Sequence, residues 1–318
     1  YEVHDRPPRM ERVVAWAKAC HAVRELEGAK IGQMGYRDMR LYGTMFDGVS
    51  LRSRIGIEVE FFEMLEMVQR GERAAKADVD AVVARVKREW EFKKPADPVV
   101  LEKAVRWYLA VRDIARERGF GAVSLIDVDG MKRLLAFPPA PIFSLLSEDP
   151  GVCTVPENDT LGAVTQLVLR SLTGQIAAYL EFYEFMEDRV LLGVPDFVPR
   201  EVVDGRVTIH PSRFGDFGEG LLNVSKLKTG RVTIARLTSS GDRYAMHVAT
   251  GNAVTPRRWE ECGWAQPAPQ LPGLEIVLDA PVEQFAQRVM SQHYFLVYGD
   301  ATAEIAELCR LLGVEVLR

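Results

Sequence analysis

The sequence predicts an α/β protein: a Rossmann-like parallel-sheet domain over residues 1–150, followed by a mixed domain with an antiparallel β-sheet or barrel over residues 151–318. Two patterns indicate this organisation. In the first half, short apolar runs bounded by glycine alternate with long amphipathic stretches, as expected when helices cover a parallel sheet. After residue 187, short alternating runs separated by Gly and Asp predict antiparallel strands. The segment 150–185 could be shared between the two domains.

The composition indicates an ordinary globular protein. The chain has 318 residues, of which 47% are hydrophobic and 27% charged, and its net charge is −5. This length allows two domains with ample core. The acidic balance gives no support for a nucleic-acid partner, and no apolar run approaches the roughly 18–20 residues that span a bilayer. Four cysteines without metal or disulfide spacing favour reduced thiols and a cytoplasmic location.

The first half is predicted to build one α/β layer. We expect a helix, a strand ending in a glycine turn, a second strand with its helix, two long amphipathic helices and a buried strand, over residues 10–26, 29–35, 55–61, 62–71, 72–94, 98–118 and 122–128. Loops at the carboxyl ends of such strands line ligand sites, so residues 35–48 would line one. Their glycines do not form a dinucleotide fingerprint. Asp127 and Asp129 end the last strand as ligands or, more often, as helix caps and loop acids.

The segment 156–187 concentrates the candidate chemistry. An acidic cluster containing Glu157 and Asp159 precedes an apolar helical run that Gly174 ends, and the strand-like run 176–183 then carries Glu181. This helix-and-return path can bring two carboxylates to one cleft, where a carboxylate is costly unless paired or metal-bound. The alternative is that Glu157 and Asp159 cap the helix, while Glu181 faces solvent on an edge strand.

The second half alternates short strands and ends with helical segments. The runs 281–290 and 301–313 predict helices around a strand over 293–300. His293 stands where the first of these helices meets the strand, and on the residues alone it is more often structural than a ligand. His210 and His247 lie in strand-like runs and are interpreted as sheet residues.

Three segments resemble one family. PENDTLGAVTQLVLRSLTG with the following YLEFYEF is similar to the active-site segment of the L-fucose isomerase and L-arabinose isomerase group of sugar isomerases. IGQMGYRDMRLYGTMFD…IGIEVEFFEML resembles that group's middle domain, and SQHYFLVYGD resembles its histidine segment. The resemblance implies a divalent metal, usually Mn²⁺, bound by Glu157, Glu181 and His293.

The same resemblance implies an activity and an assembly. We expect a metal-dependent aldose–ketose isomerase that acts on a free sugar of the L-fucose, D-arabinose or L-arabinose type through an enediol, with Glu157 and Glu181 as catalytic carboxylates. Zinc could use the same ligands. The family forms homo-oligomers, typically hexamers. Its members carry a further α/β domain ahead of this point, so we expect truncation, cleavage or a shorter architecture before Tyr1.

One departure and one loop qualify the resemblance. L-Arabinose isomerases have another His ligand after a Leu-Gly pair, whereas Leu192-Gly193 is followed here by Val194, Pro195 and Asp196, which favours the fucose-type set of three ligands. Trp264 and Trp259 flank a glycine in a loop-like stretch, where aromatic rings stack on a sugar or hold the loop. The resemblance assigns Trp264 to substrate binding.

Two rival functions remain open at this stage. One is a sugar-binding or regulatory protein that keeps the fold without turnover. The other is a metal-dependent sugar lyase or epimerase that uses the same enediolate chemistry. Ketose formation from an aldose in the presence of Mn²⁺ would distinguish isomerase activity from both.

Overall fold

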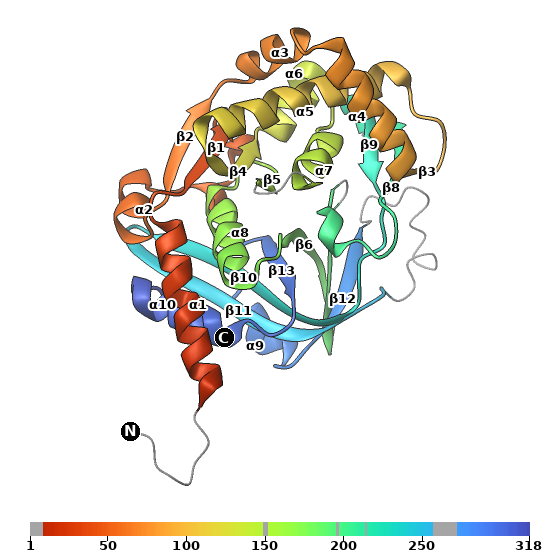
Figure 1. Ribbon diagram of the computed structural model, residues 1–318. Coiled ribbons are helices and arrows are strands. Elements are labelled where there is room, and N and C mark those ends of the chain that lie inside the picture. The colour runs from red at the N-terminus through yellow and green to blue at the C-terminus, as the bar shows by residue number, and fades with distance from the viewer. Residues whose placement is uncertain (1–8, 149–151, 195–196, 214, 257–271) are drawn as a thin grey trace.

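A parallel sheet and a closed antiparallel barrel organise the chain (Figure 1). The structure is a computed structural model that describes residues 9–148, 152–194, 197–213, 215–256 and 272–318. It confirms the predicted fold class, a mixed α/β architecture with a parallel sheet and a barrel. Within the described residues, no helix combines the length and apolarity needed to cross a membrane.

The parallel sheet has the strand order β2-β1-β4-β5. Helices cover both faces, and each face belongs to a different apolar core. The α5 core joins α3, α4, α5 and α7 to one face and continues into the barrel, whereas the α8 core joins α1, α2 and α8 to the other. The strands are β1 (Lys30–Met34), β2 (Glu58–Phe62), β4 (Phe120–Leu125) and β5 (Cys153–Val155); the helices are α1 (Met10–Leu26), α2 (Gly48–Arg54), α3 (Met64–Glu72), α4 (Lys76–Glu89), α5 (Pro98–Arg118), α7 (Ala140–Glu148) and α8 (Thr160–Thr173).

Local signals fix α5 at the predicted residues. Asp97 accepts a hydrogen bond from the Val99 N–H, Pro98 occupies the first turn, and Gly119 ends the helix with φ 71°. Two other predictions are less accurate. The stretch 72–94 contains α4 and then the short strand β3 (Glu91–Phe92), and the strand predicted over 122–128 ends at Leu125. A π-helix, η3 (Asp127–Lys132), follows it, and a three-residue helix, α6 (Arg133–Leu135), comes next.

The barrel closes because β10 pairs with both β13 and β11. Its order is β10-β13-β6-β7-β12-β11, with β14 added in parallel to β11. These elements are β6 (Ala178–Phe185), β7 (Arg189–Gly193), β10 (Gly230–Ser240), β11 (Arg243–Val254), β12 (Gly273–Leu278), β13 (His293–Tyr298) and β14 (Glu315–Leu317), with α9 (Val282–Ala286) and α10 (Thr302–Leu312) near its last strands. Ring closure pairs every strand of this barrel on both sides.

Helix α8 lies between the parallel sheet and the barrel (Figure 1). It contacts β1, β4 and β5 on one side and β10 and β13 on the other. Such a position leaves little surface for solvent, and the helix is buried from Thr160 to Leu169. The turn that precedes the helix therefore lies between the parallel sheet and the barrel.

A small third sheet, β3-β8-β9, also joins the two halves of the chain. β3 pairs in parallel with β8 (Thr208–Arg213), which pairs with β9 (Glu219–Asn223). Short 3₁₀ helices complete the described elements: η1 (Asp38–Arg40), η2 (Tyr42–Thr44), η4 (Arg200–Val202) and η5 (Gly215–Phe217). With β5 in the first sheet and β3 bonded to β8, the division at residue 150 stays a prediction.

Candidate active site

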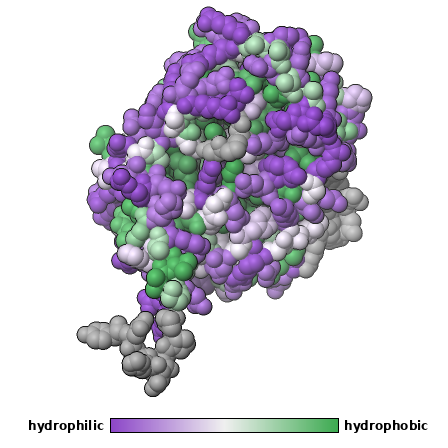
Figure 2. Space-filling view, viewed as in Figure 1, coloured by the Kyte–Doolittle hydropathy of each residue, from purple (hydrophilic) through white to green (hydrophobic). Residues whose placement is uncertain are grey.

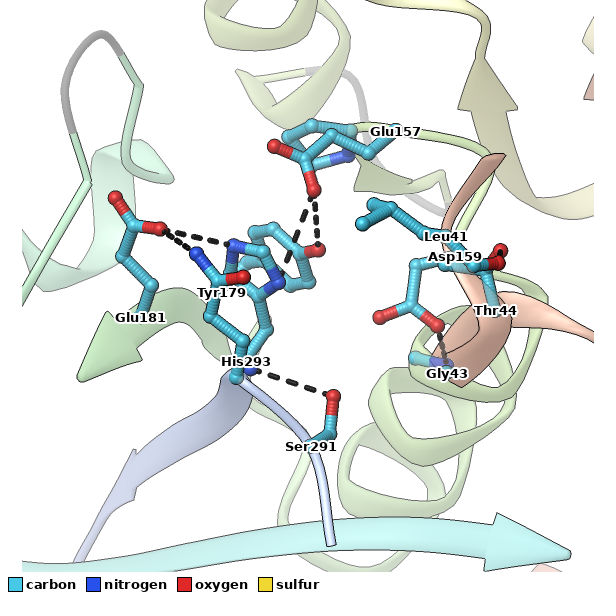
Figure 3. A network of polar contacts seen from close by, with 12 residues as sticks. Leu41, Gly43, Thr44, Glu157, Asp159, Tyr179, Glu181, Ser291 and His293 are labelled. Carbon is cyan, nitrogen blue, oxygen red and sulfur yellow. Dashed lines mark hydrogen bonds and ion pairs between the residues drawn. The ribbon is translucent and has the colours of Figure 1, made fainter. Parts of the chain in front are cut away.

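Glu157, Glu181 and His293 meet in the seam between the parallel sheet and the barrel (Figure 3). Glu157 lies in the turn between β5 and α8, Glu181 on β6 and His293 at the start of β13. His293 Nδ1 lies 3.7 Å from Glu157 Oε2, and its Nε2 lies 3.5 Å from Glu181 Oε2. The imidazole is thus placed between two carboxylates that come from separate layers.

Strand register brings Glu181 and His293 together. β6 and β13 are antiparallel neighbours in which His293 is opposite Glu181 and Phe295 is opposite Tyr179. Side chains two residues apart share a face, so these four side chains stand on one side of the barrel wall. Tyr179 and Phe295 belong to the α8 core, which identifies this side as the one that faces α8.

Two neighbouring side chains complete the polar contacts. The Tyr179 ring stacks on His293 with centroids 4.2 Å apart, and its hydroxyl donates to Glu157 Oε2 at 3.5 Å. The Gln292 amide donates to Glu181 Oε2. The sequence did not single out Tyr179, because an aromatic residue in an apolar strand is typical of a core position; its two-residue spacing from Glu181 was the available signal.

The two carboxylates have pKa values shifted in opposite directions. Burial, followed by the nearby carboxylates of Asp127 and Glu181, raises the pKa of Glu157 well above its usual value. Burial also acts to raise the pKa of Glu181, but the hydrogen bond and charge of His293, together with hydrogen bonds from Tyr183 and Gln292, outweigh it, and the pKa is lowered. Divergent pKa values in one pair of acids are a common basis for dividing proton transfer between them.

A buried cluster follows the ends of the neighbouring parallel strands. Asp127 follows β4, and its Oδ2 lies 3.1 Å from the Lys132 ammonium. Asp38 follows β1 and accepts the N–H groups of Asp127 at 3.0 Å and of Asp129 at 2.7 Å. Burial, followed by hydrogen bonding to Asp127, raises the pKa of Asp38 to about 7. The strands β1, β4 and β5 therefore each place an acid beyond the same edge of the sheet, the usual location of ligand sites in α/β folds.

The structure distinguishes between the alternative interpretations of the acidic residues. Asp159 caps α8 by accepting the Gly162 N–H at 2.9 Å, as the capping interpretation expects. Glu181 does not lie on an edge strand, since β6 pairs with both β13 and β7. Asp129 accepts the Met39 N–H at 2.7 Å as a loop acid, whereas Asp127 pairs with Lys132 instead of capping.

The remaining candidates lie elsewhere or outside the described residues. His210 lies on β8 and His247 on β11, in strands as predicted. Trp264, Trp259 and Asp196 fall outside the described residues. Within the described part of the chain, no three His, Cys, Asp or Glu side chains surround a common point as ligands of an ion would. The two imidazole nitrogens of His293 face different carboxylates, so the three side chains contact one another and do not converge on one point. Mn²⁺ binding by Glu157, Glu181 and His293 therefore stays a prediction.

Known proteins similar to this chain are sugar isomerases. No protein-family model matches it. It is 22% identical to the sulfoquinovose isomerase of Alkalicoccus urumqiensis over 98% of this chain and 70% of that protein, and 23% identical to that of Priestia megaterium over 98% and 69%. It is also 22% identical to the L-arabinose isomerase of Shouchella clausii over 97% of this chain and 64% of that protein. These similarities, which extend over nearly the whole chain, support its placement in the L-fucose isomerase and L-arabinose isomerase-like family of sugar isomerases.

Proposed function

We propose that this protein is a metal-dependent aldose–ketose isomerase. The observation that carries the proposal is the meeting of Glu157 and Glu181 on either side of His293. The isomerase names of its relatives support the same reaction class. Aldose–ketose isomerisation moves a proton between adjacent carbons and needs a base beside a polarised carbonyl.

The donor set fits a hard divalent cation. Two carboxylates and one imidazole are ligands that Mn²⁺ accepts. Glu157 is partly buried beside the carboxylates of Asp127 and Glu181, and a cation there would relieve their repulsion. Glu157, Glu181 and His293 would hold the ion, which would supply Lewis-acid polarisation of the sugar oxygens.

The residues of the chain divide the remaining work. Glu181, whose pKa is lowered, is ionised at neutral pH and can take the proton from the carbon next to the carbonyl. Gln292 bonds Glu181 Oε2 and fixes the direction of its carboxylate. Tyr179 supports the His293 ring by stacking and bonds Glu157 through its hydroxyl.

Sugar turnover in deuterium oxide tests the reaction class. The protein, first freed of metal by a chelator and then supplied with Mn²⁺, is incubated with L-arabinose, L-fucose, D-arabinose and sulfoquinovose and followed by NMR. We expect a ketose with solvent deuterium at the exchanging carbon, formed only with the metal. Glu184→Gln on the same strand is the matched control, because Glu184 is exposed and should be dispensable. Metal binding without exchange on any of these aldoses would contradict isomerisation and favour a sugar-binding role.

We also propose that the chain forms a homo-oligomer. Met10, Val13, Val14 and Trp16 on α1 are each about half exposed, and apolar side chains gather at this end of the helix in the space-filling view (Figure 2). Contiguous exposed apolar residues favour an interface. Light scattering at micromolar concentration should give a mass several times that of the chain, and a stable monomer would contradict this proposal.

A further inference from the structure

The turn that carries Glu157 has a backbone that its residues rarely adopt. Glu157 and Asn158 have φ values of 62° and 52°. Left-handed backbone is uncommon for residues other than glycine and costs free energy, so it persists where surrounding contacts hold it. Two such residues in succession, one of them a candidate ligand, need an identifiable restraint.

One restraint comes from the parallel sheet. The Asn158 amide donates to the Met34 carbonyl at 2.9 Å and to the Tyr36 carbonyl, and the Thr160 hydroxyl donates to Gln33 Oε1. These contacts attach the turn to the end of β1. They do not attach it to the barrel, which carries Glu181 and His293.

The second restraint comes from the barrel through Arg236. This residue is the first of β10 beyond its pairing with β13, whose last pair is Ala235 with Phe295. The guanidinium binds both carboxylate oxygens of Asp159, at 2.8 Å for Nη2 and Oδ1, and also donates to the Gly43 carbonyl at 3.2 Å. Arg236 and Asp159 are each 1% exposed. A bidentate pair of this kind fixes direction as well as distance.

The Asp159 carboxylate packs closely against the first turn of α8. A methyl group on Gly162 would lie 2.5 Å from Asp159 Oδ2 and 3.0 Å from the tip of the Phe295 ring. Glycine at this position therefore lets the carboxylate lie against the first turn of α8. Asp159 thus caps the helix, binds the barrel and stands two residues after Glu157. Leu41, Gly43 and Thr44 border the same region (Figure 3).

We propose that Arg236 is a positioning residue for the active site: by holding Asp159 it sets the place of Glu157, on the sheet side, relative to Glu181 and His293, on the barrel side. The effect on catalysis rests on the proposed function. The effect on the position of Glu157 does not depend on it. A purely stabilising pair would have no such effect. Arg189 and Glu275 provide that comparison, because they are 6% and 2% exposed, lie 3.1 Å apart and stand on the barrel strands β7 and β12. Arg189 also pairs with Asp188, whose side chain is exposed and keeps its contact with solvent in the control variant.

The test compares two double variants. Removing one partner alone would leave a buried charge, so each pair is replaced whole. Asp159→Asn with Arg236→Met keeps a capping side chain on α8, and Arg189→Met with Glu275→Gln is the matched control. With folding verified by circular dichroism, we expect the first variant to raise the Mn²⁺ Kd and lower kcat/KM by about 10- to 100-fold, as when residues that orient metal ligands are lost. The control should change neither, although its melting temperature falls.

A milder variant keeps every charge. Gly162→Ala pushes the Asp159 carboxylate away from the helix and should weaken Mn²⁺ binding in the same direction. Equal Mn²⁺ Kd and kcat/KM values in the wild type and the Asp159→Asn/Arg236→Met variant would overturn the inference. If the wild type itself binds no Mn²⁺, the proposed function fails. Crystal structures of the wild type and the two double variants then test separately whether Arg236 sets the position of Glu157. In the wild type, Glu157 lies 3.7 Å from His293. A crystal structure in which Glu157 is displaced in the Asp159→Asn/Arg236→Met variant but not in the control variant supports the inference. An unmoved Glu157 in the Asp159→Asn/Arg236→Met variant refutes it.

Discussion

The two sides of the barrel wall each contain a histidine stacked on an aromatic ring, and their surroundings differ. On the side facing α8, His293 stacks on Tyr179 at 4.2 Å and lies between Glu157 and Glu181. On the other side, His247 stacks on Phe285 at 4.7 Å, and its Nδ1 hydrogen-bonds the Tyr294 hydroxyl at 2.6 Å. One ring has carboxylate neighbours and the other has aromatic neighbours.

This difference shows which side of the barrel wall brings a histidine next to carboxylates. Both histidines are buried, so burial alone does not distinguish them. His247 is fully enclosed, and burial together with the Arg288 charge lowers its pKa to about 4, so that it stays neutral at neutral pH. His293 instead faces a second layer that brings its own carboxylate. The acids beside a histidine are found in the seam between the layers.

The largest expected contrast comes from replacing each histidine by glutamine. His293→Gln should lower kcat/KM by about 10²- to 10⁴-fold, the range for loss of a positioned catalytic group, because the side chain between the carboxylates is removed. His247→Gln should leave kcat/KM within about threefold, since that ring contacts Tyr294 and Phe285 and neither of the two candidate carboxylates. Steady-state kinetics at saturating Mn²⁺ measures both. Equal losses in the two variants would mean that His293 is also structural.

The next contrast lies between the two carboxylates beside His293. Glu181→Gln keeps the shape but removes the base, so turnover at saturating Mn²⁺ should fall by at least about 10²-fold. The Mn²⁺ affinity should fall less than in Glu157→Ala, which deletes a ligand outright. Exposed Glu184→Gln on the same strand is the control. Near-normal turnover of Glu181→Gln would assign the proton transfer to another group.

A third test uses pH and applies to the enclosed histidine. The pKa of His247 is about 4 in the folded protein and about 6.5 when unfolded. Well above pH 6.5 both states are neutral and the residue contributes no pH dependence. As pH falls, the unfolded state binds the proton first, so stability should decline by about 2 kcal/mol between pH 7 and pH 5. Urea unfolding of the wild type and of His247→Gln at several pH values measures the contribution of His247 to the free energy of unfolding. The same pH dependence of the free energy of unfolding in both proteins would contradict a lowered pKa for His247.

The smallest contrast concerns the two tyrosines. Tyr179→Phe keeps the stack on His293 but removes the 3.5 Å hydrogen bond to Glu157, a loss of about 0.5–1.5 kcal/mol or at most roughly tenfold in kcat/KM. Tyr294→Phe removes the bond to His247 and should lower the free energy of unfolding by a similar amount without altering kcat/KM. Equal effects of the two variants on kcat/KM would show that the two sides of the wall are not functionally distinct, and reversed effects would place the active side on the other face.

Local chemistry made part of this fold predictable from the sequence. Asp97, Pro98 and Gly119 mark both ends of α5, and the short alternating runs after residue 187 indicate the barrel strands. The pairing of β3 with β8 was not predictable, because two residues carry no periodicity and their partner lies more than a hundred positions away. The π-helix after β4 also has no distinct sequence pattern.

The candidate site divides in the same way. Glu157 and Glu181 stand out as acids flanking an apolar segment, and the family resemblance pointed to His293. The cross-strand register that sets His293 opposite Glu181 is a tertiary fact. The sequence did not single out Lys132, and only the fold encloses it beside Asp127. Arg236 has the pattern of an ordinary strand residue, and only the fold places its guanidinium beside Asp159, where the pairing of β10 with β13 ends.

Barrel closure also has a kinetic consequence. The Gln292–Glu181 contact joins residues 111 positions apart, and the β6–β13 ladder beside it completes one wall of the ring. Contacts so distant along the chain form slowly because a large loop must close before they repay its entropy. During synthesis β6 emerges long before β13 and presents an unpaired edge in the interval. The candidate site would thus assemble late, and a chain stalled before β13 would hold both carboxylates without the histidine between them.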